Sequence, residues 1–175
     1  MMSPGRFAGK VALITGGGTG IGAATAQRIA NEGGTPIVMG RREAPLRAVA
    51  EACGGHVVLG DTTSLADLER AVGQAKERFG GLDVLIANAG IELFGSVETV
   101  PLDQWQNVLA VNLEGAMLAA RVAIPAMRLR GGGAIVLVAS VAALSGAPSY
   151  VSYLTSKAGL LGLNRSIAYD YGAEG

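Results

Sequence analysis

Five short runs of mostly apolar residues alternate with helical stretches along this chain of 175 residues. The runs cover residues 11–14, 36–39, 56–59, 82–87 and 134–138. Strands that are apolar on both faces are typical of a parallel sheet covered by helices on both sides, and right-handed helical crossovers join such strands. The sequence therefore predicts a doubly wound α/β fold with one domain over residues 1–175. In folds of this class, ligands bind at the C-terminal ends of the strands.

Helical spacing of apolar residues fills the gaps between the strands. Ser64 is expected to cap one helix, with Asp67 three residues later as in a capping box. A break in the fourth helix is expected near residues 112–115, and residues 1–8 are expected to form a mobile arm. The helices are predicted over residues 21–31, 43–53, 64–79, 101–130 and 150–171.

Charge and cysteine content limit the classes of binding partner and the cellular compartment that we expect. Fourteen basic residues balance fourteen acidic ones, so the net charge favours neither nucleic acid nor an anionic membrane. Residues 115–127 come nearest to a membrane-spanning segment, but Arg121 and Pro125 interrupt them. The single cysteine, Cys53, excludes an intramolecular disulfide and is consistent with a reducing cytoplasm. No metal site is expected.

A glycine-rich loop from Thr15 to Gly22 joins the first strand to the first helix. The amides of such a loop and the positive end of the helix dipole can hold a pyrophosphate, and the missing side chains let the phosphates approach closely. A purely structural glycine turn is the alternative. The loop is not a P-loop, because no Gly-Lys-Ser/Thr ends it.

The residues after the second strand bear on the choice of nicotinamide cofactor. An acidic residue there would bind the adenosine ribose hydroxyls, whereas a basic residue would accept a 2′-phosphate. Here Gly40 is followed by Arg41 and Arg42, which favours NADP(H) over NAD(H). The alternative is that both arginines are solvated at the start of a helix.

Two further strand ends carry candidate cofactor contacts. Asp61 follows the third strand, where it could bond the adenine amino group or cap the next helix. Asn88, Ala89 and Gly90 follow the fourth strand, where small residues let the backbone lie against a flat ligand. A simple turn explains these three residues equally well.

The fifth strand leads to a serine, and the helix after it carries a tyrosine and a lysine four residues apart. Tyr153 and Lys157 therefore share one helix face, and Ser140 is expected at the C-terminal end of a buried strand. A tyrosine is a poor acid or base at neutral pH, but a nearby ammonium favours the phenolate. The three groups predict proton transfer to an alkoxide or carbonyl oxygen. The alternative is an ordinary pairing of an amphipathic tyrosine with a solvated lysine.

These motifs together resemble the short-chain dehydrogenase/reductase family. The resemblance rests on Thr-Gly-xxx-Gly-Ile-Gly at residues 15–22, Asn-Ala-Gly at 88–90, Asn112, and Ser140 thirteen residues before Tyr153. It covers residues 8–175 and implies a Rossmann-type fold whose five strands lie in the order 3-2-1-4-5. Family members normally continue beyond this point through further strands and a substrate lid, so an exposed sheet edge is expected beside the fifth strand.

The resemblance also implies roles for single residues. Tyr153 would be the general acid or base, and Ser140 would polarise the substrate oxygen. Lys157 would hold the nicotinamide ribose and favour the phenolate, while Asn112 would place a water for proton relay. On the residues alone, Asn112 could be a helix-breaking residue with no part in catalysis. The expected cofactor contacts are Gly16, Gly18, Thr19, Gly20, Ile21, Gly22, Arg41, Arg42, Asp61, Asn88, Ala89, Gly90, Tyr153 and Lys157.

The function expected from the sequence is an NADP(H)-dependent oxidoreductase, either a ketone reductase or a secondary-alcohol dehydrogenase. The alternative from another class is a dinucleotide-binding module without turnover. The apolar helices over 115–130 and 150–171 predict a homo-oligomer, a tetramer or a dimer. The candidate substrate-pocket residues are Ile91, Leu93, Phe94, Val141, Leu144 and Tyr150.

Overall fold

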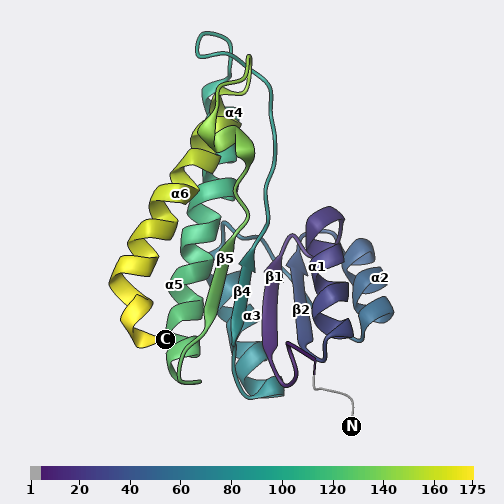
Figure 1. Cartoon of the computed structure of the whole chain (residues 1–175). Coiled ribbons are helices and arrows are strands. Elements are labelled where there is room, and N and C mark those ends of the chain that lie inside the picture. The colour runs from purple at the N-terminus through teal and green to yellow at the C-terminus, as the bar shows by residue number, and fades with distance from the viewer. Residues whose placement is uncertain (1–4) are drawn as a thin grey trace.

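Five parallel strands form the centre of the computed structural model, which describes residues 5–175 (Figure 1). Their order across the sheet is β3-β2-β1-β4-β5, so the expected Rossmann-type topology is confirmed. Because all five run in the same direction, their C-terminal ends meet at one edge of the sheet. The strands are β1 (Val11–Thr15), β2 (Thr35–Gly40), β3 (His56–Leu59), β4 (Val84–Ala87) and β5 (Ala134–Leu137).

The helices begin and end within a few residues of the predicted positions. Ser64 caps α3 by accepting a hydrogen bond from the Asp67 amide at 3.2 Å, as expected. The Asp67 carboxylate does not complete a capping box, because it accepts instead from the Asp61 amide at 2.9 Å. The helices are α1 (Gly20–Asn31), α2 (Glu43–Cys53), α3 (Leu65–Phe79), α4 (Leu102–Leu109), α5 (Gly115–Arg128) and α6 (Val151–Tyr171).

Two apolar clusters fill the space on the two sides of the sheet. Alternation along each strand divides the buried residues between the clusters. Leu13, Met39 and Leu85 belong to the cluster with α3, α5 and α6, whereas Ile14 and Ile86 belong to the cluster with α1 and α2. The molecule is therefore a three-layer sandwich in which the helices cover both faces (Figure 1).

The fifth strand departs from the expectation of a fully buried sheet. Val136 pairs with Ile86 and so faces the α1 and α2 side, where its side chain is 48% exposed. The reason is that α1 and α2 pack over β1, β2 and β3, at the other end of the sheet. Ser140 thus follows a strand that is half covered, and the outer edge of β5 has no strand partner within residues 5–175.

The expected helix break near residues 112–115 is wrong. A π-helical segment, Ala110–Glu114, joins α4 to α5 without interruption. The continuous helix Leu102–Arg128 has 27 residues and is long and apolar enough to cross a membrane by length and composition alone, contrary to the sequence expectation. Its α5 half buries Ala116, Ala119 and Ala123 in the sheet cluster, which is the behaviour of a core helix.

The expected mobile arm is fixed to α1 over its described part. The Phe7 amide donates to the Glu32 carbonyl at 3.1 Å, and the Arg6 guanidinium binds the Glu32 carboxylate at 2.5 and 2.7 Å. Hydrogen bonds from Arg6, with those from Arg28, lower the pKa of Glu32 to about 2. Residues 1–4 of the expected arm lie outside the described residues.

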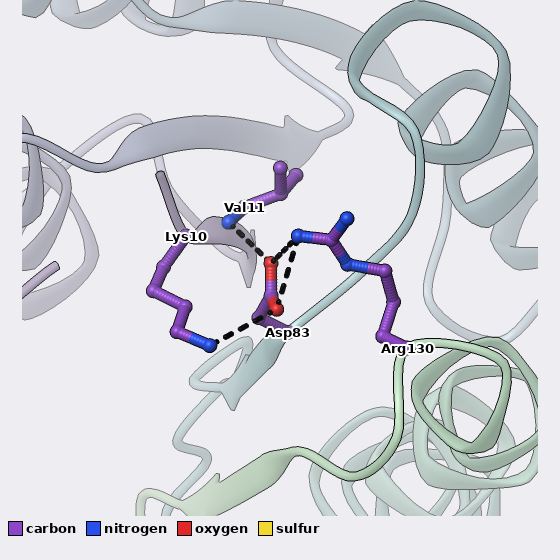
Figure 2. A network of polar contacts seen from close by, with 4 residues as sticks. All are labelled: Lys10, Val11, Asp83 and Arg130. Atoms are coloured by element: carbon purple, nitrogen blue, oxygen red, sulfur yellow. Dashed lines mark hydrogen bonds and ion pairs between the residues drawn. The ribbon is translucent and has the colours of Figure 1, made fainter. Parts of the chain in front are cut away.

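A buried carboxylate, Asp83, bonds to residues at the starts of three strands, β1, β4 and β5, and Figure 2 shows its contacts. Asp83 precedes β4 and is 6% exposed; its carboxylate accepts from the Val11 amide at 2.9 Å and from Arg130 at 3.2 Å. Lys10 adds a contact at 3.4 Å. Burial alone would raise the pKa of Asp83, but the Val11 amide and the two cations outweigh it and lower that pKa.

Candidate active site

Thr15 locks the glycine loop to the segment after β4. Its hydroxyl accepts hydrogen bonds from the Asn88 amide at 3.0 Å and the Ala89 amide at 3.1 Å. The Asn88 side chain donates in return to the carbonyls of Thr15 and Gly16, at 3.0 and 3.2 Å. Two of the predicted motifs thus form one rigid unit. Thr15 was part of the predicted loop but was not among the expected site residues, although a polar residue at the end of a buried strand was a usable signal.

The start of α1 is suited to an anion. Its N-cap residue, Thr19, makes no side-chain capping bond, so the amides of the first turn remain available to a ligand. Gly16 adopts a φ of 64°, in the left-handed region that favours glycine. A side chain at Gly22 would collide with the Gly16 carbonyl, so the loop can close only with glycine there.

The loop opens into a cavity of ≈ 480 Å³ at the C-terminal edge of the sheet. The cavity runs from the arginines after β2, past the glycine loop, to Ile91 after β4, and a glycine loop at a helix start is a site that can hold phosphates. Four predicted contacts do not line the cavity: Gly20 and Gly22 shape the helix start, and Tyr153 and Lys157 belong to α6. The predicted residues that do line it are Gly16, Gly18, Thr19, Ile21, Arg41, Arg42, Asp61, Asn88, Ala89 and Gly90.

Both arginines after β2 reach toward this cavity. The Arg41 guanidinium lies 3.7 Å from the Asp61 carboxylate, and Arg42 approaches the Thr19 hydroxyl at 3.4 Å. The Asp61 carboxylate also accepts from the amide and hydroxyl of Thr63, both at 2.9 Å. Asp61 therefore fixes a turn and does not cap α3, whose cap is Ser64. Its other oxygen is paired with Arg41, and Asp61 lines the cavity.

The tyrosine and lysine of α6 lie together as the spacing predicted. The Lys157 ammonium is 5.8 Å from the centre of the Tyr153 ring and donates to the Val138 carbonyl at 2.7 Å. Lys157 is only 5% exposed, and this burial lowers its pKa. A solvated lysine, the alternative considered from the sequence, is therefore excluded.

Ser140 begins a short 3-10 helix, Val141–Leu144, after β5. Its hydroxyl oxygen accepts from the Ala142 amide at 3.1 Å, which leaves its proton free to be donated to another group. The bond from Lys157 to the Val138 carbonyl holds the same segment two residues earlier. Serine, tyrosine and lysine thus come from two segments that are tied to one another.

Asn112 is buried in the π-helical segment and is fully hydrogen bonded. Its side-chain oxygen accepts from the Ile91 amide at 2.8 Å, and its nitrogen donates to the Ile91 carbonyl at 2.9 Å and to the Ser156 hydroxyl at 3.0 Å. Asn112 therefore fastens the helix to the segment after β4 and does not break it. A Cβ at Gly90 would lie 3.4 Å from the Asn112 oxygen and 3.5 Å from the Lys157 nitrogen, so both groups flank that backbone. Ser156 was not among the site residues expected from the sequence.

Two aromatic side chains, Tyr150 and Phe94, lie beside Tyr153. Tyr150 packs its ring edge against Phe94, with centroids 4.8 Å apart, and lies 6.3 Å from the Tyr153 ring. Burial, helped by the Glu92 carboxylate, raises the pKa of Tyr150. Figure 1 shows the connections before α4 and before α6 extending together beyond the sheet, and a backbone pairing of Gly95 with Tyr150 joins them. The remaining predicted pocket residues are Ile91 and Leu93, which are partly buried, and Val141 and Leu144, which are 88% and 82% exposed.

Comparison with known proteins decides the family. The family model described as short chain dehydrogenase matches residues 10–175, nearly the whole chain. This chain belongs to the short-chain dehydrogenase family. The resemblance inferred from the glycine loop and the α6 motif is confirmed, and the family's reactions are those of oxidoreductases acting on alcohol and carbonyl groups.

Two relatives and one solved structure illustrate this membership. Dehydrogenase/reductase SDR family member 4 of Bos taurus is 41% identical over 167 residues, which cover 92% of this chain and 60% of the relative. Trans-4-hydroxycyclohexanecarboxylate dehydrogenase of Sinomonas cyclohexanicum is 38% identical, with 95% and 68% covered. A crystal structure of a short-chain dehydrogenase/reductase from Burkholderia xenovorans has a TM-score of 0.91 at 36% identity, with 97% and 72% covered. This chain thus spans 60% to 72% of these three short-chain dehydrogenases.

Proposed function

We propose that this protein interconverts a carbonyl compound and a secondary alcohol with NADP(H) as the cofactor. One observation carries the proposal. The buried Lys157 ammonium lies 5.8 Å from the Tyr153 ring and beside the Gly90 backbone, where the cofactor cavity ends. A cation held there favours the phenolate and can bind a ribose hydroxyl at the same time. When bound, the nicotinamide supplies or accepts the hydride.

The chain's own residues move the proton and hold the oxygen. In reduction, Tyr153 gives its phenolic proton to the carbonyl oxygen, and in oxidation its phenolate takes the proton from the alcohol. The free hydroxyl proton of Ser140 is donated to the same oxygen and stabilises the charge that develops there. Lys157 stabilises the phenolate that reduction leaves, and a proton from solvent water then restores the phenol of Tyr153. Hydrogen bonds between Thr15 and Asn88 hold the glycine loop at a fixed distance from the backbone after β4.

The approach to Tyr153 favours a substrate with an apolar body. Tyr150 lies next to Tyr153 and packs against Phe94. Val141 and Leu144 expose their side chains on the short helix that packs against α6. We expect the purified protein to oxidise NADPH when a panel of apolar ketones is supplied. Binding of NADPH without consumption under any of these ketones would instead support the alternative of a dinucleotide-binding module.

The cofactor preference has its own prediction. Arg41→Ala should weaken NADPH binding by roughly 10- to 100-fold, because a charge-assisted bond to the 2′-phosphate is lost. NADH affinity should change much less, since NADH carries no such phosphate. Calorimetric titration of both cofactors gives the two ratios.

A matched control for Arg41 is Arg47 on α2, which is also exposed and pairs with Glu43. Arg47→Ala removes the same charge from the same part of the surface, but Arg47 does not line the cofactor cavity. Arg47→Ala should leave the affinities for NADPH and NADH within about twofold of the wild type if the loss in Arg41→Ala depends on a local contact and not on net charge. Equal losses of NADPH and NADH affinity in Arg41→Ala would remove the argument for the phosphate.

We also place α5 and α6 at an interface between copies of this chain. Met117, Ile124 and Leu163 line an open groove between the two helices, and Arg121 and Asp170 lie in it with opposite charges. A two-fold axis through this groove would bring apolar and complementary charged groups together. Sedimentation should show a dimer or tetramer, and a monomer at micromolar concentration would refute the interface.

Cys53 is the chain's single cysteine and is a free, partly buried thiol. It cannot form an intramolecular disulfide. A free thiol is consistent with a reducing compartment, and we propose the cytoplasm as the location.

A further inference from the structure

Ser156 lies one residue before Lys157 on α6 and is completely buried. Its hydroxyl donates to the Tyr153 carbonyl at 2.7 Å and accepts from the Asn112 side-chain nitrogen at 3.0 Å. The Ser156 hydroxyl therefore accepts one hydrogen bond and donates one, and it links the Asn112 side chain to the Tyr153 backbone. The bond joins the helical turn that carries the tyrosine and lysine to the π-helical segment.

Asn112 extends this chain of bonds to the cofactor side of the site. The Ile91 amide donates to its side-chain oxygen, while its nitrogen donates one proton to the Ile91 carbonyl and the other to Ser156. A flipped amide would place its nitrogen against the Ile91 amide and its oxygen against the Ile91 carbonyl. The orientation of Asn112 is thus fixed by partners on both sides, and Ser156 supplies the partner on the α6 side.

We propose that Ser156 is a positioning residue: through Asn112 it holds the turn of Tyr153 and Lys157 at a set distance from the backbone at Gly90 and Ile91. This inference rests on the proposed function. The two groups that it aligns, the Asn112 oxygen and the Lys157 nitrogen, both flank the Gly90 backbone. Loss of the Ser156 hydroxyl leaves one buried Asn112 proton without an acceptor, so the turn of Tyr153 and Lys157 is no longer bonded to Asn112 and can shift.

A second serine on the same helix provides a matched control. Ser152 lies four residues earlier, is also completely buried, and its hydroxyl has no hydrogen-bond partner within the described residues. Ser152→Ala and Ser156→Ala remove the same atoms from the same face of α6. Ser152→Ala therefore measures the effect of losing a buried hydroxyl as such, whereas Ser156→Ala also removes the bonds to Asn112 and Tyr153.

Ser156→Ala should lower kcat by roughly tenfold while changing the Kd for NADPH by less than about twofold. In the direction of alcohol oxidation, the pH midpoint of kcat/KM should rise by roughly half a unit or more, because a displaced ammonium favours the phenolate less. Ser156→Thr keeps the hydroxyl and should recover most of the loss. Ser152→Ala should leave kcat and the pH midpoint unchanged.

The Asn112 side-chain amide gives a readout that does not depend on turnover. In the NMR spectrum of the free protein, its two protons should exchange with solvent faster in Ser156→Ala than in the wild type or Ser152→Ala. Unchanged exchange in Ser156→Ala would overturn the inference even if the wild type is inactive. If the wild type turns over, an unshifted pH midpoint with kcat equal to that of Ser152→Ala would overturn it while the proposed function stands.

Discussion

Tyr153→Phe should lower kcat by about 10²- to 10⁴-fold, the range typical of a general acid–base group. The change removes the phenolic hydroxyl and keeps the ring, so the packing against Tyr150 at 6.3 Å is retained. Lys157 also keeps its bond to the Val138 carbonyl and its place beside Gly90. The Kd for NADPH should therefore stay close to the wild-type value. Steady-state kinetics and calorimetric titration on the same preparation measure both quantities.

Tyr150→Phe is the control, because it removes the same hydroxyl from the neighbouring tyrosine at the mouth of the site. Its ring contact with Phe94 is retained, and kcat should change by less than about tenfold. If Tyr153→Phe retained turnover within tenfold of the wild type, the assignment of the general acid to Tyr153 would be wrong.

Asp83→Asn should have the largest effect on stability, a loss of about 2 kcal/mol in the free energy of unfolding at pH 7. The carboxylate is 6% exposed and accepts from Val11, Lys10 and Arg130, so an amide in its place leaves two cations without their anion (Figure 2). The three strands β1, β4 and β5 then lose the contact that fixes their starting edge. Urea denaturation of the two proteins measures the difference.

The pH dependence of this difference follows from the lowered pKa of Asp83. In the unfolded chain the carboxyl titrates near about 3.9, and in the folded protein it titrates lower. The stabilisation is therefore complete above the unfolded pKa and is lost as the pH falls through the folded pKa. The gap between wild type and Asp83→Asn should close in acid. Glu69→Gln, a change at an exposed carboxylate on α3, should show no gap at pH 7; an equal loss there would mean that net charge, and not the buried network, is responsible.

The sequence was sufficient for the order and type of the elements. Continuous apolar runs such as residues 11–14 and 134–138 predict parallel strands because such strands are buried on both faces. The limits of helices with clear caps were also predictable, as at Ser64, where the hydroxyl accepts from the Asp67 amide. These features depend on neighbouring residues alone, so local reasoning reaches them.

Features that depend on distant segments were not predictable in this way. Val136 is apolar and still 48% exposed, because what covers a strand is decided by where α1 and α2 pack. A helix break was predicted at Asn112 because asparagine has a low helix propensity. The bonds of Asn112 to Ile91 and Ser156 instead keep it inside a helix. Because the helix is not broken at Asn112, residues Leu102–Arg128 form one helix long enough to cross a membrane.

The candidate site divides along the same line. Tyr153, Lys157 and the glycine loop follow fixed local spacings, which the structure preserves. Thr15 in the site and Asp83 at the opposite edge of the sheet act through partners more than seventy residues away in the sequence, as the bonds to Asn88 and Val11 show. The signal that could have pointed to them is a polar side chain within or at the end of a buried strand, since such a group needs a partner.

Deuterium transfer is the most direct test of hydride chemistry at this site. The protein is supplied with an apolar ketone and NADPH that carries deuterium on one or the other face of nicotinamide C4, and the alcohol is analysed by mass spectrometry. We predict that one of the two labelled cofactors places a single deuterium on the carbinol carbon, and that the other places none. Alcohol without deuterium from either cofactor, or bound NADPH that no ketone consumes, would contradict the proposal that this chain is an NADP(H)-dependent oxidoreductase.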